Sequence, residues 1–188
     1  MKQKSISTYD LCIMAVFTAI IAVMAQIIIP MPFLVPMTLQ TLAIAMAGVL
    51  LGAKKGTIST IIYVLIGATG APIFAGGTGG LGTVFGPTGG FIMSFPLLAL
   101  AAGIGAEKSC KDLQSTKSKA LWLWGGLVVG VAVNYLCGVV YYSIVTSNDL
   151  STSFVACVLF FIPTDIIKIL IAGVFGAKVR KLVLPKIV

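Results

Sequence analysis

The sequence predicts an all-α integral membrane protein that forms a single domain over residues 1–188. Of its 188 residues, 59% are hydrophobic and 10% are charged, and the mean hydropathy is +1.11. Soluble globular domains carry roughly 25% charged residues, so this chain has too few polar groups to cover its surface in water. Six apolar runs and a one-sided distribution of positive charge lead to the same prediction.

The six apolar runs predict six transmembrane helices. They cover residues 11–29, 39–52, 57–70, 89–105, 120–145 and 154–177. A helix needs about 20 residues to cross a bilayer, and the second and third runs are shorter than that. Short spans are tolerated where protein shields them or where they line a cavity, so we expect these two to lie against their neighbours.

The first run is bounded by lysines and by prolines. It follows Lys2 and Lys4, as the apolar part of a signal peptide would, with residues 23–25 as the cleavage site. The apolar stretch continues through Ile29 and five further runs follow, so we expect it to remain as a span. The next residues, 29–37, are apolar and rich in proline and cannot form regular helix.

The last three runs each carry a distinctive feature. The fourth follows a glycine-rich stretch over 76–90, where glycine permits positive φ and close backbone approach. This stretch and the proline-rich one are candidate lids. The fifth run carries Asn134 and Tyr135. The sixth carries Pro163, which removes a helical hydrogen bond and is expected to bend the helix.

Positive charge sets the expected topology. With six spans, twelve of the thirteen lysines and arginines fall on one side. They are Lys2, Lys4, Lys54, Lys55, Lys108, Lys111, Lys117, Lys119, Lys178, Arg180, Lys181 and Lys186. The loops of the other side carry one charge, Asp149. Lys and Arg gather on the cytoplasmic side, so both termini are expected to be cytoplasmic. This distribution explains the net charge of +8 without nucleic acid as a partner.

Asp165 and Lys168 are the strongest functional signal. An ionisable residue at membrane depth costs several kcal/mol and is a candidate functional residue by default. Residues three apart share a helix face, so these two side chains can partly neutralise each other. They form either a ligand site or a structural ion pair that fixes helix packing, and we favour the ligand site.

Asn134, Tyr135, Gln40 and Thr38 are further candidates, because amide and hydroxyl groups can bind a polar ligand. Each could instead bond a neighbouring helix. We predict no catalytic residue, no cofactor and no metal ligand. The chain has no histidine, its four cysteines lack ligand spacing, and it contains no G-x-x-x-x-G-K-[ST] motif. It is therefore predicted not to be an enzyme.

Several motifs, taken together, resemble one family. They are VPMTLQTL at 35–42, GAP at 70–72, FAGG at 74–77, GGLG at 79–82, FGPTGGF at 85–91 and P-x-D-x-x-K at 163–168. In these motifs, over nearly its whole length, the chain resembles the BioY family, the biotin-specific substrate-binding subunits (S components) of energy-coupling factor (ECF) transporters. In many relatives a tyrosine stands where this chain has Phe91.

The resemblance implies a six-helix S-component fold in a bacterial cell membrane. It implies high-affinity capture of biotin from outside and uptake energised by two cytoplasmic ATPase subunits through a transmembrane coupling subunit. S components are thought to topple in the membrane to release the ligand. In this family an Ala-x-x-x-Ala pattern in the first helix contacts the coupling subunit, which makes Ala15 and Ala19 the matching residues.

Biotin can be matched to the candidate residues by its chemistry. Its ureido group has two N–H donors and a carbonyl, and an alkyl tail carries a carboxylate. Asp165 as a carboxylate accepts from ureido N–H, whereas Lys168 donates to either the ureido oxygen or the tail carboxylate. The two side chains are about 5–6 Å apart at Cβ, less than the length of extended biotin. We therefore favour both on the ureido head.

The other candidates are matched to the remaining parts of biotin. Tyr135 is expected to pack on the ring or to hydrogen-bond the head, and Asn134 to add a polar contact. The tail carboxylate is expected to meet backbone N–H groups of the glycine-rich stretch, at Thr88 and Gly89, or a side chain near Gln40.

Three other functions stay open. One is an S component for another small vitamin or a biotin precursor, which competition by desthiobiotin, thiamine and riboflavin would reveal. Another is a membrane-embedded enzyme that uses Asp165 and Lys168 as acid and base, which would release a transformed product. The last is a structural or holin-like pore, which would show no saturable ligand binding.

Overall fold

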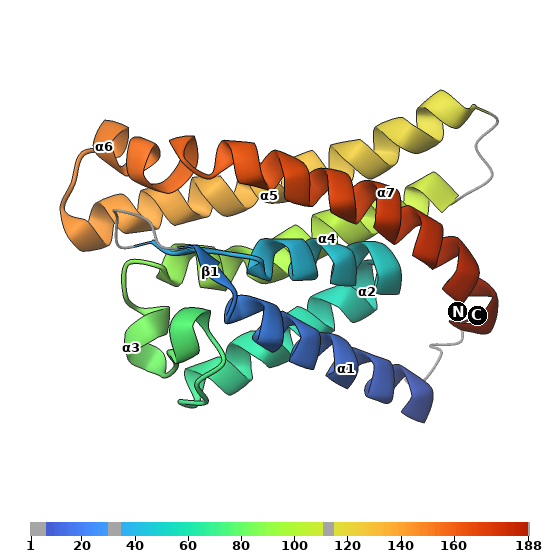
Figure 1. Ribbon diagram of the computed structural model, residues 1–188, viewed down its shortest axis with the longest axis horizontal. Coiled ribbons are helices and arrows are strands. Elements are labelled where there is room, and N and C mark those ends of the chain that lie inside the picture. Colours follow the sequence, from blue (N-terminus) through green and yellow to red (C-terminus); the bar gives the residue numbers. More distant parts are fainter. Residues whose placement is uncertain (1–6, 30–34, 111–114, 188) are drawn as a thin grey trace, which may run out of the picture.

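The computed structural model describes residues 7–29, 35–110 and 115–187, and long helices lying roughly along one axis form most of it (Figure 1). The long helices are α1 (Thr8–Ala25), α2 (Gln40–Ala68), α4 (Gly89–Cys110), α5 (Thr116–Thr146) and α7 (Ile162–Ile187). The shorter elements are β1 (Ile28–Ile29), β2 (Met37–Thr38), η1 (Ala75–Gly77), α3 (Leu81–Val84), α6 (Leu150–Phe154) and the π-helical η2 (Val155–Leu159). The two strands pair antiparallel.

The predicted all-α class is confirmed. The first, fourth and fifth apolar runs correspond to α1, α4 and α5, and the sixth is divided among α6, η2 and α7. Among the described residues, four helices are long and apolar enough to cross a membrane. A fifth is added if Leu150–Leu159 and Ile162–Arg180, which meet at 47°, form one span. The number of six crossings stays a prediction.

The second and third runs together form α2, which folds back on itself. Gly52 (φ 85°, ψ 176°) interrupts the helix. A Cβ atom at Gly56 would lie 2.7 Å from the carbonyl oxygen of Ala47, whereas residues nine apart in a straight helix are roughly 13 Å apart along the axis. Gln40 also donates to the Tyr63 hydroxyl at 2.5 Å. α2 is therefore two antiparallel arms joined at Gly52, which Figure 1 shows running out and back.

The helix ends form two distinct ends of the molecule. The start of α1, the turn of α2, the end of α4, the start of α5 and the end of α7 lie together, at the right in Figure 1. We call this the basic end, because the basic residues described in these segments are Lys54, Lys55, Lys108, Lys117, Lys119, Lys178 and Arg180. The strands, α3 and α6 lie at the other end. The orientation of the two ends across a membrane stays a prediction.

Polar contacts join the helices at the basic end. Lys55, just after the turn of α2, forms an ion pair with Asp10 of α1 at 2.6 Å. Glu107, near the end of α4, accepts a hydrogen bond from the Ala53 amide at 2.8 Å. One free amide at the start of the second α2 arm therefore has a carboxylate partner, which helix N-termini favour.

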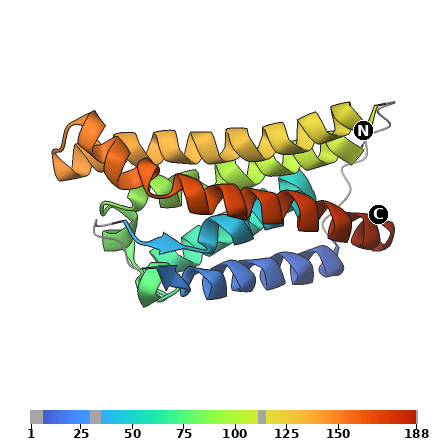
Figure 2. The same cartoon turned by 45° about the horizontal axis from the view of Figure 1, so that its top comes forward.

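α4 lies at the centre of the bundle and α1 at its edge. Of the apolar stretch of α4, 61% is buried, compared with 22% for α1. Small residues allow the central helices to approach closely: a Cβ at Gly48 of α2 would lie 2.3 Å from the Ala99 carbonyl oxygen of α4. Figures 1 and 2 both show α1 on the outside of the bundle.

Candidate ligand-binding cavity

A cavity of about 340 Å³ lies at the end opposite to the basic end. Its walls come from β2 and the start of α2, from residues 74–78 and 82–88, and from α4, α5 and α7. Small-molecule sites range over roughly 300–1,000 Å³ and are mostly apolar with a few polar groups. Aromatic side chains supply much of this wall. Its charged and amide side chains lie on α2, α5 and α7, and threonines of β2 and of residues 78–88 add hydroxyl groups.

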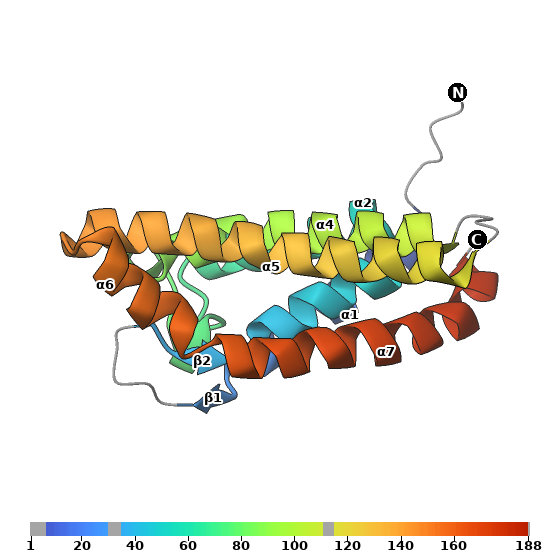
Figure 3. The same cartoon turned by 90° about the horizontal axis from the view of Figure 1, so that it is seen from above.

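A bend in the chain before α7 places the first turn of α7 in the cavity wall. The chain changes direction by 47° between η2 and α7 (Figure 3), so the bend predicted from Pro163 is confirmed. Pro163 is the second residue of α7, where a helix has no need of the missing amide. Asp165 follows in the first turn, where the helix dipole favours a carboxylate.

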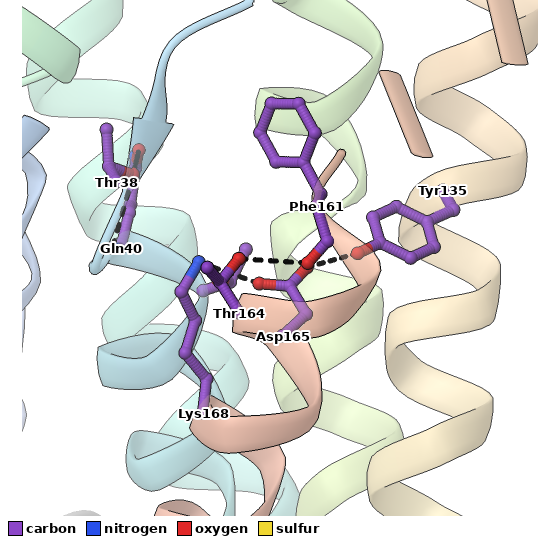
Figure 4. A network of polar contacts seen from close by, with 8 residues as sticks. Thr38, Gln40, Tyr135, Phe161, Thr164, Asp165 and Lys168 are labelled. Atoms are coloured by element: carbon purple, nitrogen blue, oxygen red, sulfur yellow. Dashed lines mark hydrogen bonds and ion pairs between the residues drawn. The ribbon is translucent and has the colours of Figure 1, made fainter. Parts of the chain in front are cut away.

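Asp165 and Lys168 form a buried ion pair in the cavity wall (Figure 4). The Lys168 Nζ lies 2.7 Å from Asp165 Oδ1, and the residues are 7% and 4% exposed. The Tyr135 hydroxyl of α5 donates to the other carboxylate oxygen of Asp165. Lys168 also donates to Thr41 Oγ1 of α2 at 3.2 Å. Three helices thus contribute to one continuous polar cluster.

The cluster keeps hydrogen-bonding capacity for a ligand. An ammonium group has three donors, and Lys168 uses two of them within the described part of the chain. Each Asp165 oxygen accepts one hydrogen bond there, although a carboxylate oxygen can accept two. The site can therefore donate hydrogen bonds to a ligand from Lys168 and accept them at Asp165, at positions only a few ångströms apart.

Gln40 lines the cavity and is held from two sides. It donates to the Tyr63 hydroxyl at 2.5 Å, and Tyr63 in turn donates to the Ile73 carbonyl at 3.0 Å. Thr38 donates to the Gln40 side-chain oxygen at 3.4 Å. These contacts fix the Gln40 amide at the start of α2, and Figure 4 shows it on the Lys168 side of the α7 pair, away from Tyr135.

The position of Asn134 fits both roles that the sequence left open, a bond to a neighbouring helix and a contact with a ligand. Its amide nitrogen donates to the Phe91 carbonyl oxygen at 3.1 Å and to Ser94 Oγ at 2.8 Å, both on α4. It therefore bonds a neighbouring helix, and it also lines the cavity. Because both contacts use the nitrogen, the side-chain oxygen is the group left for a ligand.

The glycine-rich stretch forms a wall of the cavity, but its two candidate residues differ. Thr88 lines the cavity. Gly89 lies outside the lining: its amide donates to the Gly86 carbonyl at 2.9 Å, and a Cβ there would lie 2.0 Å from the Val84 carbonyl oxygen. In the proline-rich stretch, Val35 and Pro36 line the cavity, and residues 30–34 lie outside the described residues.

Ala15 and Ala19 lie far from this cavity, on α1. Both are exposed, whereas Met14, Thr18 and Ile21 are buried on another face of the same helix. α1 therefore presents a face of small and apolar residues to the outside of the bundle.

The sequence analysis missed the aromatic wall at Phe74, Phe95 and Phe161 and also residues that support the polar candidates. Thr41 accepts a hydrogen bond from Lys168, and Tyr63 holds Gln40. Thr41 is adjacent to Gln40 in a polar pair at the entrance of an apolar run, which was a usable signal. No sequence signal pointed to Tyr63, because its contact with Gln40 forms only when the two arms of α2 pack antiparallel.

Comparison with known proteins gives consistent matches. The model of the BioY family matches residues 1–185. The biotin transporter BioY of Rhizobium etli is 35% identical over 176 residues, covering 92% of this chain and 94% of that protein. The biotin transporter BioY of Thermotoga maritima is 36% identical over 170 residues, covering 89% and 93%. A crystal structure of the S-component for biotin from an ECF-type ABC transporter matches with a TM-score of 0.82 and 30% identity, covering 96% of this chain and 95% of that one.

Proposed function

Because the chain belongs to the BioY family, we propose that it captures biotin in the cavity between α2, α4, α5 and α7 as the substrate-binding subunit of an ECF-type transporter. The predicted family and S-component fold are confirmed by the match to the solved S-component for biotin. The relatives are named as transporters, which agrees with the prediction of a transport subunit rather than an enzyme.

The observation that carries the proposal is the buried cluster of Asp165, Lys168 and Tyr135 in an otherwise largely apolar cavity. A ureido group carries donors and an acceptor side by side, so it needs both kinds of partner within a short distance. Asp165 accepts from the ureido N–H, and Lys168 donates to the ureido oxygen. Since the pair closes to 2.7 Å, both residues serve one end of the ligand.

The rest of the cavity suits the rest of biotin. The aromatic walls at Phe91, Phe95 and Phe161 bury the fused ring and the alkyl tail, which gains roughly 25 cal/mol for each Å² of apolar surface removed from water. The tail carboxylate meets polar groups on the side of Gln40 and Thr88. Asn134 adds its side-chain oxygen as an acceptor.

The proposal extends to the setting of the subunit. The basic end faces the cytoplasm of a bacterial cell and the cavity opens to the outside, in agreement with the positive-inside rule. The exposed face of α1 at Ala15 and Ala19 meets the transmembrane coupling subunit, and two cytoplasmic ATPase subunits supply the energy. The exposure of this face, on a helix whose apolar stretch is less buried than those of α2, α4 and α5, supports that assignment.

Titration calorimetry tests the proposal directly. Protein purified in detergent from biotin-depleted cells should bind biotin saturably and one to one, and neither thiamine nor riboflavin should compete. Tighter binding of desthiobiotin or of another vitamin would reassign the substrate. Recovery of a chemically changed ligand, measured by mass spectrometry, would favour an enzyme, and no binding by folded protein would refute the proposal.

A further inference from the structure

The side chain of Gln26 connects the end of α1 to the wall of the cavity. Gln26, the C-cap residue of α1, donates from Nε2 to the Phe74 carbonyl at 3.1 Å and to the Ile73 carbonyl at 3.4 Å. It also donates to the Ala22 carbonyl of its own helix at 3.0 Å. The amide nitrogen therefore bridges α1 and a segment 47 residues further along the chain.

The segment that Gln26 holds carries a cavity wall. Phe74 lines the cavity and is 1% exposed. Its ring packs edge-on against Tyr63, with centroids 5.5 Å apart, and fills the space above Gly67. Tyr63 also donates to the Ile73 carbonyl and accepts from Gln40. One short path thus runs from α1 through the Ile73–Phe74 backbone to a polar group of the cavity.

This segment owes its shape to turns rather than to regular structure. Gly76 and Gly77 have φ values of 68° and 70°, a region that glycine adopts without strain. The turn closes on itself through the Phe74 amide, which donates to the Thr78 carbonyl at 2.9 Å. Tyr63 holds the Ile73 carbonyl from inside the protein, and Gln26 adds a second anchor from α1 at the Ile73 and Phe74 carbonyls.

Of α1, α2, α4 and α5, α1 has the smallest buried share of its apolar stretch, 22%. A peripheral helix gives up less packing when it shifts than a central one. Any shift of α1 moves Gln26, because its side chain also bonds the carbonyl of Ala22 within the helix.

We propose that Gln26 is a positioning residue that ties α1 to the Phe74 wall, so that retention of the ligand depends on where α1 lies. The inference rests on the proposed function for its ligand but not for its geometry. With α1 docked, the two carbonyls are held and Phe74 closes the cavity. With α1 displaced, the turn at 73–78 loses its outer anchor and the ligand leaves faster.

The test compares three substitutions at position 26 in the full chain. Gln26→Met keeps the length and removes the donors. Gln26→Glu keeps the shape but sets a carboxylate against two carbonyls. Gln26→Lys restores a donor. We expect biotin to dissociate about three- to tenfold faster from the Met and Glu variants, the effect of losing one or two modest hydrogen bonds, and at nearly the wild-type rate from the Lys variant.

Hydrogen exchange of the ligand-free protein gives a second, independent readout. Amides of residues 71–80 should exchange faster in Gln26→Met and not in Gln26→Lys, while those of α4 and α5 stay unchanged. Thr69→Val is the matched control, because it removes a hydroxyl bond to the Ile66 carbonyl nearby without touching α1.

The outcomes separate the inference from the function. Biotin binding with equal dissociation rates in all variants would overturn the inference and leave the function standing. No binding by the wild type would refute the function, and unchanged exchange in Gln26→Met would then show that Gln26 does not hold the wall. Equal acceleration in the Lys variant would assign the effect to packing, which also overturns the inference.

Discussion

Among the α7 side chains that the structure describes, those up to Arg180, two cations are buried, and their partners differ in kind. Lys168 and Arg180 are almost equally buried, at 7% and 6% exposure, and both reach the first arm of α2. Lys168 contacts side chains, those of Asp165 and Thr41. Arg180 contacts the backbone, donating to the carbonyl oxygen of Val49 in the last turn of that arm.

The difference teaches which buried charges can serve a ligand. Side-chain partners can rotate toward a ligand and return, so the Lys168 cluster can exchange its hydrogen bonds. Helix-end carbonyls are orphan acceptors that need a donor, and they cannot leave without unwinding the arm. A buried charge in a membrane helix therefore indicates a binding site less strongly by its burial than by having partner side chains that can rotate toward a ligand.

Removing the Asp165 charge should produce the largest effect on binding. Asp165→Asn leaves Lys168 buried without its counter-charge and takes away an acceptor for the ureido N–H. We expect biotin affinity to fall on the order of 100-fold, measured by titration calorimetry. Asp149→Asn, an exposed acid outside the cavity, is the control and should bind normally. An Asp165→Asn protein within threefold of wild type would remove Asp165 from the site.

Removing the Arg180 charge should instead weaken the fold. Arg180→Met leaves carbonyls of the α2 arm without their donor, a loss of about 2 kcal/mol. We expect the Tm in detergent to fall by roughly 4–8 °C, with biotin affinity unchanged below that temperature. Lys178→Met, an exposed cation on the same helix, should leave the Tm in place. Loss of binding by folded Arg180→Met protein would contradict the distinction drawn between the two cations.

The Thr41 contact allows a finer test at the cavity. Thr41→Val keeps the volume but removes the acceptor for Lys168, so we expect biotin affinity to fall about three- to tenfold, the worth of one hydrogen bond. Thr60→Val is the matched control, since Thr60 is buried in the second arm of the same helix and bonds only the Gly56 carbonyl. Equal losses in both variants would point to a packing effect.

The smallest change is expected at the partly exposed pair of Lys55 and Asp10. Lys55→Met removes an ion pair of a kind worth about 0–1 kcal/mol. The Tm should move by no more than about 4 °C, and biotin affinity should stay the same. A shift as large as that of Arg180→Met would mean that the basic end depends on this pair as well.

The helices could be predicted because membrane helices must be apolar along their whole length. Even the break in α2 was visible, since Lys54 and Lys55 interrupt the apolar sequence immediately after Gly52. The strands, η1 and α3 were not predicted. They lie in proline- and glycine-rich stretches, where backbone hydrogen bonds rather than a periodic pattern decide the local structure.

The site was predictable where the signal lay within one helix. Asp165 and Lys168 stand out as ions in an apolar run, and their spacing of three gives the contact. Thr41 meets Lys168 across 127 residues, a contact that follows only from the packing of α2 against α7. At Gly89 the amide turns toward the Gly86 carbonyl, and no sequence pattern shows the direction of a backbone N–H.

The internal neutralisation of Asp165 by Lys168 also has an electrical consequence. Moving one elementary charge through a membrane potential of 100 mV involves about 2.3 kcal/mol of work. The ion pair of Asp165 and Lys168, with its charged atoms 2.7 Å apart, carries no net charge. When the ligand-free cavity moves along the membrane normal, the membrane potential therefore does almost no work on this pair. Under the proposed function, the carboxylate of the bound ligand is then what the voltage acts on within the cavity.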